Sequence, residues 1–144
     1  MKFTARIPFI VAVSIIFACD EEVSLPLTAN LVTIINAYDL DNNGDGSDVR
    51  VDFSVLNNLN VEEYRIMIIP EVSRSTFNEE SAEITPRTNY TIIFPEAFKI
   101  EYSLNRFPST LLDVNGSPIR NDFNYVMAIY VVGKSERQLS QFTE

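Results

Sequence analysis

The sequence predicts an all-β protein, an antiparallel sandwich of about seven strands. Apolar and polar residues alternate over residues 49–55 and again over residues 98–104, which is the pattern of a strand with one buried face. Turn signals such as Asn43-Gly44 and Asn115-Gly116 separate the β-rich segments. The chain has 144 residues, 46% of them hydrophobic and 22% charged, which suits one globular domain over residues 31–144.

The expected strands differ in how apolar their two faces are. The segments 49–55 and 98–104 have one apolar face, which would bury Phe53 in the first and would carry Phe98, Ile100 and Tyr102 in the second. Other segments are apolar on both faces, as central strands are, and we expect Tyr125 to be largely buried in one of them. In chain order, the seven expected strands cover residues 31–38, 49–55, 64–69, 90–94, 98–104, 125–132 and 138–142.

One segment has helical rather than β periodicity. Thr76 and Glu79 have the spacing of a capping box, and Phe77 and Ile84 would share one helical face. Pro86 would end the helix. The pattern predicts one short helix near residues 76–84, between two strands.

The N-terminus predicts a signal peptide over residues 1–18. Lys2 and Arg6 form a short basic region, and an almost wholly apolar run of 12 residues follows, from Ile7 to Ala18. Such a run is too short to span a bilayer, which takes about 20 residues, but it is typical of a signal-peptide core. The run ends at Cys19, which is the only cysteine in the chain.

The residues Ile16-Phe17-Ala18-Cys19 resemble the lipobox of bacterial lipoproteins, with an aliphatic residue three places before the cysteine and a small one just before it. The resemblance implies cleavage before Cys19, a diacylglycerol thioether on its sulfur and an amine acylated with a fatty acid such as palmitate. Two or three acyl chains make a stable anchor, so the membrane would be a partner of this chain. The alternative is an ordinary signal peptide in which the cysteine is incidental.

An acidic run, Asp20-Glu21-Glu22, follows the cysteine. It resembles the signal that sends lipoproteins of the Bacteroidetes to the outer face of the outer membrane, and residues 43–51 and 112–116 also look like segments of Bacteroidetes surface lipoproteins. An Asp directly after the cysteine also resembles an inner-membrane retention signal, which would leave the domain facing the periplasm. A third interpretation is a solvated charge run. The three acids favour the outer membrane and the cell surface, with residues 19–30 as the lipidated cysteine and an acidic tether.

Composition excludes several classes of function. The chain has no histidine, which removes the Ser-His-Asp and Cys-His catalytic arrangements and the usual zinc sites. Its 20 acidic and 11 basic residues give a net charge of −9, so nucleic acid is not an expected partner. Glu79, Glu80 and Glu83 could serve glycoside hydrolysis, but that chemistry needs a cleft with a fixed carboxylate separation. A solvated helix face is the simpler interpretation, and we expect no enzymatic activity.

Three segments, Val51-Asp52-Phe53-Ser54, Glu63-Tyr64-Arg65-Ile66 and residues 124–129, together resemble a fibronectin type III or related immunoglobulin-like module. The resemblance implies that Phe53 takes the place of the family's strand-B tryptophan and Tyr64 that of its strand-C tyrosine. It also implies that Tyr125 forms a tyrosine corner, whose hydroxyl binds upstream backbone.

Several oxygen-bearing side chains lie close together between the first two expected strands. They are Asp39, Asp41, Asn43, Asp45 and Asp48. Carboxylates and amides in a loop bent at a glycine are hard oxygen ligands of the kind that calcium prefers. The loop resembles the EF-hand pattern, but position twelve is Arg50 rather than glutamate, and no helices are expected beside it. We therefore expect either a hairpin calcium loop or a plain polar turn.

Together these features predict a surface-anchored, non-enzymatic lipoprotein whose β-sandwich serves interaction or structure. The alternative is a glycan-binding accessory lipoprotein of a polysaccharide-uptake system, with Tyr38, Tyr102 and Tyr130 as an exposed platform for sugar rings. Besides the membrane, the partner would accordingly be a protein or a glycan.

Overall fold

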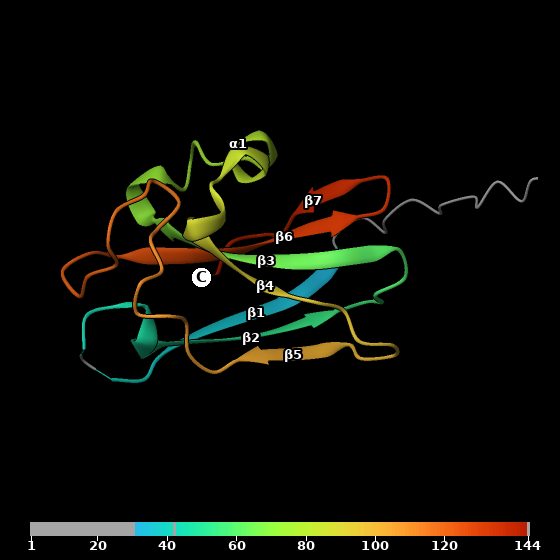
Figure 1. Cartoon of the computed structure of the whole chain (residues 1–144), viewed down its shortest axis with the longest axis horizontal. Coiled ribbons are helices and arrows are strands. Elements are labelled where there is room, and N and C mark those ends of the chain that lie inside the picture. Colours follow the sequence, from blue (N-terminus) through green and yellow to red (C-terminus); the bar gives the residue numbers. More distant parts are fainter. Residues whose placement is uncertain (1–30, 42, 144) are drawn as a thin grey trace, which may run out of the picture.

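The computed structural model describes residues 31–41 and 43–143, which form two antiparallel sheets packed face to face (Figure 1). The expected signal peptide, Cys19 and the tether lie outside the described residues, as do Asn42 and Glu144. One sheet has the strand order β1-β2-β5, and the other has the order β4-β3-β6-β7. The predicted antiparallel β-sandwich is therefore confirmed.

Each expected strand corresponds to one strand of the structure. The strands are β1 Val32–Asp39, β2 Val49–Val55, β3 Val61–Pro70, β4 Tyr90–Ile93, β5 Glu101–Leu104, β6 Tyr125–Gly133 and β7 Arg137–Leu139. The largest differences in boundary are at the starts of β3 and β5 and at the end of β7. β3 starts three residues earlier than expected because its first residue, Val61, still pairs with Gly133 of β6.

The main core lies between the two sheets and is centred on three aromatic rings. Phe53 of β2 stacks on Tyr102 of β5 at a centroid separation of 5.1 Å, and it meets Tyr64 of β3 edge-on at 5.4 Å. All three side chains are buried, which confirms the prediction for Phe53. Tyr125 is only partly buried, so the prediction of a largely buried side chain there is wrong. Its position at the start of β6 leaves it at the rim of the core.

A second apolar layer covers the outer face of the four-stranded sheet, and this explains why β3 and β6 are apolar on both faces. Met67, Ile69, Ala128 and Tyr130 are buried there. They pack beneath the short helix α1, Glu79–Ile84, and beside residues from the neighbouring loops and the C-terminal segment. In Figure 1, α1 lies over this sheet, on the side away from β1, β2 and β5.

The helix forms within the predicted range but has a different cap. Asn78 is the N-cap, and its Oδ1 accepts a hydrogen bond from the N–H of Ser81 at 3.0 Å. Thr76 lies in the preceding turn, where its hydroxyl donates to the carbonyl of Ser73, so the predicted capping box is wrong. The described residues also form the 3₁₀ segments η1 Gly46–Asp48, η2 Glu71–Ser73 and η3 Arg87–Asn89. Among the described residues, no helix has the length and apolar character needed to cross a membrane.

The segment 98–104 departs from its alternating pattern. Only residues from Glu101 onward form the strand, and Tyr102 and Leu104 face the core as expected. Phe98 is 97% exposed and has φ +64°, and Ile100 is also exposed. The left-handed backbone at Phe98 turns the chain out of the strand direction, so the apolar alternation continues in the sequence while the strand has not yet begun.

We expect Phe53→Ala to lower the free energy of unfolding by about 3–5 kcal/mol, because it removes a buried ring that touches two others. Phe98→Ala is the matched control and should change the stability by less than about 0.5 kcal/mol, since its ring is exposed. Urea unfolding measures both values. Equal losses in the two variants would contradict the burial of Phe53 and its place in β2.

Candidate functional site

The predicted calcium loop connects β1 to β2 at one end of the sandwich. The N–H of Leu40 donates to the carbonyl of Asp48 at 2.7 Å, which continues the pairing of the two strands into the loop. Gly44 has φ +80°, a conformation that glycine adopts without steric cost. The 3₁₀ segment η1 then leads directly into β2.

The acidic residues of this loop are held in different ways. Asp48 is 3% exposed, and its Oδ2 accepts a hydrogen bond from the N–H of Gly44. Asp45 caps η1, because its Oδ1 accepts from the N–H of Ser47 at 2.8 Å. Hydrogen bonds from the side chain and backbone of Ser47 lower the pKa of the Asp45 carboxyl. Asp41 forms an ion pair with Arg106, with 2.7 Å between its Oδ2 and the arginine Nη2. Asp39 and Asn43 are exposed.

Within residues 31–41 and 43–143, no three acidic side chains come together in a group that could hold a metal ion. One feature still favours a ligand here. The Oδ1 of Asp48 is buried and has no hydrogen-bond partner among the described residues. A buried carboxylate oxygen without a partner costs free energy, which a cation or a donor from a ligand would recover. Calcium binding by Asp39, Asp41, Asn43, Asp45 and Asp48 stays a prediction.

The loop forms one wall of an open cleft of about 390 Å³. The other wall is the segment that precedes β6, which contributes Arg120, Asn121, Phe123, Asn124 and Tyr125. The lining residues on the loop side and the floor are Ala37, Tyr38, Asp39, Asp45, Asp48, Val49, Ile119 and Met127. Half-exposed aromatic rings beside carboxylates, amides and a guanidinium make a surface of mixed chemistry, which is typical of ligand sites.

Several contacts shape the second wall of the cleft. The guanidinium of Arg120 lies 4.5 Å from the ring centroid of Phe123, and its Nε is 3.7 Å from the Oδ1 of Asp122. The N–H of Arg120 donates to the hydroxyl of Tyr125 at 3.2 Å. Asn121 approaches the loop, since a Cβ built on Gly44 would lie 3.3 Å from its Nδ2. These residues were not predicted as site residues, although the polar and aromatic run before an apolar strand was a usable signal.

The aromatic platform expected for sugar binding is not formed by the predicted residues. Tyr102 and Tyr130 are 4% and 1% exposed, and only Tyr38 is exposed. Tyr102 lies on the apolar face of its strand and packs in the main core, and Tyr130 is buried on the outer face of the four-stranded sheet with residues of α1. The platform of Tyr38, Tyr102 and Tyr130 is therefore wrong.

The three glutamates of α1 lie on the exposed side of the helix. Glu83 accepts a hydrogen bond from the hydroxyl of Tyr130, and its Oε2 lies 3.7 Å from the Nε of Arg137. Glu79 and Glu80 occupy the first helical turn, where negative charge stabilises the helix. These contacts give the three acids structural roles on α1.

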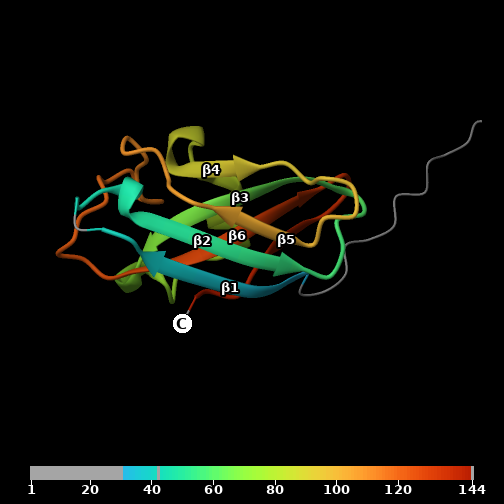
Figure 2. The same ribbon diagram turned by 90° about the horizontal axis from the view of Figure 1, so that it is seen from below.

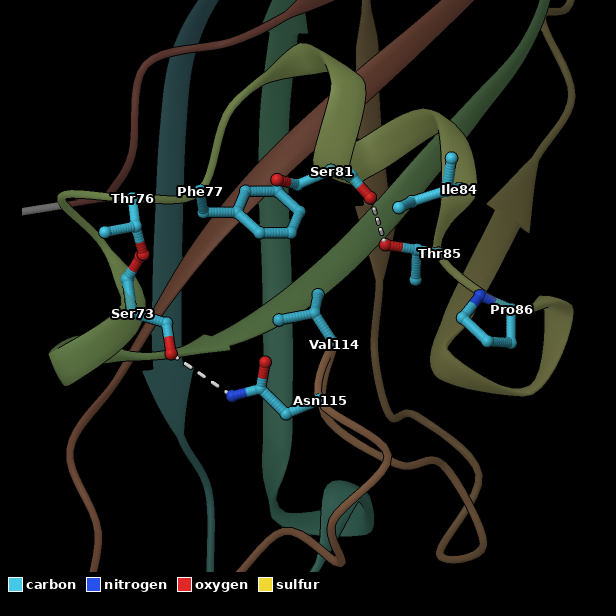
Figure 3. Close-up of a pocket in the computed structure, with 9 residues that line it drawn as sticks. All are labelled: Ser73, Thr76, Phe77, Ser81, Ile84, Thr85, Pro86, Val114 and Asn115. Atoms are coloured by element: carbon cyan, nitrogen blue, oxygen red, sulfur yellow. Dashed lines mark hydrogen bonds between the residues drawn. The ribbon is translucent and has the colours of Figure 1, made fainter.

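A second, smaller hollow of about 290 Å³ lies between η2, α1 and the turn around Asn115 (Figure 3). Its lining consists of hydroxyl, amide and apolar side chains without a charged group. Two of the polar groups are already paired: the Asn115 amide donates to the Ser73 hydroxyl at 3.1 Å, and the Thr85 hydroxyl donates to the Ser81 carbonyl at 2.8 Å. The cleft beside Asp48 is therefore the stronger candidate site.

No protein-family model, no curated protein and no solved structure matches this chain.

We expect calcium to raise the melting temperature relative to chelator, because a cation would neutralise the acidic loop and fill the position beside the Asp48 Oδ1. At a hundredfold excess over its dissociation constant, a ligand of the folded state stabilises by roughly 2.7 kcal/mol. Asp41→Ala and Asp48→Asn should reduce the shift, whereas Glu80→Gln on α1 should not. Magnesium serves as the control ion, since it demands a more regular octahedron. Identical wild-type midpoints in calcium and chelator would leave the loop as a polar turn.

Proposed function

We propose that this chain is a lipid-anchored, non-enzymatic β-sandwich that presents its cleft to a ligand at the end remote from the anchor. The observation that carries the proposal is the course of β1. The strand begins beside Leu31, where the chain arrives from Cys19, and ends at Asp39 on the wall of the cleft. Eight residues at about 3.3 Å each separate the two ends by roughly 25 Å. A domain tethered at Leu31 therefore holds the cleft away from its membrane.

The anchor itself is supported by the sequence around Cys19. The basic start, the 12-residue apolar run and the small Ala18 are the features that signal and lipoprotein peptidases require, and Cys19 has no other cysteine to pair with. The acidic run after Cys19 supports the outer membrane and the cell surface, and a periplasm-facing domain is the alternative.

The strand arrangement supports a fibronectin type III or immunoglobulin-like module. The first, second and fifth strands share one sheet, and the third, sixth and seventh share the other, as in an immunoglobulin sandwich. Tyr125 at the start of β6 binds the backbone of Arg120, five residues upstream, in the manner of a tyrosine corner. Phe53, which would take the place of the strand-B tryptophan, packs in the core against Tyr64.

Glycan binding is the second candidate function, and a specific feature of the cleft favours it. Tyr38 and Phe123 are about half-exposed, and Asn121 and Asn124 line the same surface. Aromatic faces pack against the apolar faces of sugar rings, while amides and carboxylates bind their hydroxyls. A protein loop with similar polar and apolar groups is the alternative occupant.

We expect Cys19→Ser to leave an unprocessed precursor without lipid, because the thiolate is the only group that can form the thioether. Metabolic labelling with a fatty acid and the apparent mass of the chain measure the outcome. Ser14→Ala lies in the same apolar run and should be labelled and processed normally. Normal labelling of the Cys19→Ser chain would overturn the lipoprotein proposal.

If the ligand is a glycan, Phe123→Ala should weaken binding by about tenfold or more, since covering a phenyl ring with an apolar sugar face is worth about 1.5–3 kcal/mol and about 1.4 kcal/mol is tenfold. Affinity electrophoresis in gels containing single soluble polysaccharides measures the change. Phe94→Ala removes an exposed ring at the opposite end and should leave binding unchanged. If no polysaccharide retards the wild-type chain, the glycan alternative fails and a protein partner remains.

A further inference from the structure

Five large apolar side chains are exposed on two loops at the end of the sandwich opposite the cleft. They are Leu56, Leu59, Phe94, Phe98 and Ile100, which we call the apolar end. Leu59 and Phe94 are 68% and 66% exposed, and Phe98 is almost wholly so. Single exposed apolar residues are common. A group of them on adjacent loops instead indicates a surface that binds an apolar partner, such as a protein or a membrane.

The two loops of the apolar end are held together by hydrogen bonds. The amide of Asn58 donates to the carbonyls of Lys99, at 3.2 Å, and Glu96. The hydroxyl of the buried Tyr102 accepts from the N–H of Glu96 at 3.2 Å and donates to the carbonyl of Lys99 at 3.1 Å. The N–H of Val55 donates to the carbonyl of Ile100 at 2.9 Å. These hydrogen bonds hold the two loops of the apolar end in one fixed arrangement.

The conformation of Phe98 is unfavourable for an isolated chain. A non-glycine residue with φ +64° carries backbone strain, and here the strained residue places an aromatic ring in water. No buried contact of this ring offsets that cost in the free domain, because the side chain is 97% exposed. Contact with an apolar medium would offset it.

The chain that comes from the proposed lipid anchor enters the sandwich beside the apolar end. The N–H of Leu56 donates to the carbonyl of Leu31 at 2.9 Å, so the first described residue is bonded to one of the two loops. Figure 2 shows the start of β1, the β2–β3 turn and the β4–β5 loop at the same end of the molecule. Between Cys19 and Leu31 the chain can span about 40 Å when fully extended, at about 3.3 Å per residue.

We propose that the apolar end docks on the bilayer that holds the acyl chains of Cys19. This inference rests on the proposed lipid anchor. The anchor keeps the domain within reach of the surface, so that even weak apolar contacts have a high effective concentration of their partner. The processed chain loses Lys2 and Arg6 with the signal peptide, which leaves 20 acidic and 9 basic residues and a net charge of −11. The surface that it contacts is therefore zwitterionic lipid rather than anionic headgroups. Docking at this end holds the cleft outward, facing its ligand.

The absence of tryptophan from the sequence allows a direct test. Phe98→Trp introduces a single indole at the apolar end, and Val72→Trp introduces one at another open position, 87% exposed, just after β3 at the opposite end. The full acylated protein is reconstituted in phosphatidylcholine vesicles with brominated acyl chains, which quench indole fluorescence on contact. We expect quenching of the Phe98→Trp protein to be at least threefold greater than that of the Val72→Trp protein. Adding Leu59→Asp to Phe98→Trp should halve the quenching without changing the melting temperature.

Flotation of the same vesicles separates the anchor from the docking. If the protein floats with the vesicles but both indoles are quenched equally, the docking is wrong and the anchor stands. If the chain is not acylated and does not float, the anchor is wrong and the docking falls with it. If the Phe98→Trp emission shifts to the blue without lipid, in proportion to protein concentration, a second copy covers the apolar end and the docking is wrong.

Discussion

The long antiparallel pairing of β3 with β6 is the contact on which the rest of the domain depends. It runs from Val61 opposite Gly133 to Pro70 opposite Tyr125, at the centre of the four-stranded sheet. Residues 66–70 of β3 and 126–133 of β6 are buried on both faces, so neither face of this part of the pair can stay in water. The inner face requires the three-stranded sheet, and the outer face requires α1 and the C-terminal segment. The sandwich and its outer helix are consequences of this one pairing.

The same pairing separates the two ends of the domain by their chemistry. At one end, the loop after β1 and the segment before β6 bring carboxylates, amides and half-exposed rings to the cleft. At the other end, the turns after β2 and β4 carry exposed apolar side chains. Antiparallel strands alternate in direction, so the connections after β2, β4 and β6 all fall at this end, where the exposed polar turn Lys134-Ser135-Glu136 borders the apolar side chains.

Charge in the acidic loop is balanced mostly by local groups. Asp45 and Asp48 accept backbone N–H groups within a few residues, and the hydrogen bonds from Ser47 lower the pKa of the Asp45 carboxyl without a counter-ion. Asp41 instead pairs with Arg106, which lies 65 residues further along the chain. The remaining buried oxygen of Asp48 is the part of the loop that these contacts leave unsatisfied among the described residues. A ligand that binds this oxygen would give the last unpaired buried oxygen of the loop a partner.

The sequence by itself determined the local features of this protein. Seven strands and the short helix could be predicted because local patterns depend only on neighbouring residues: period-2 alternation in 49–55 and a β-rich apolar run in 125–132. Tertiary structure alone decided what covers each face and which loops meet. The alternation of 98–104 predicts that Tyr102 faces the core, but only the packing of α1 on the four-stranded sheet decides that Tyr130 is buried as well. The cleft joins Tyr38 to Phe123, and the apolar end joins Leu59 to Phe98, across distances in sequence that no local pattern spans. The strand order decides which loops lie side by side. That order depends on the total apolar surface that the whole chain buries, and no single segment determines it.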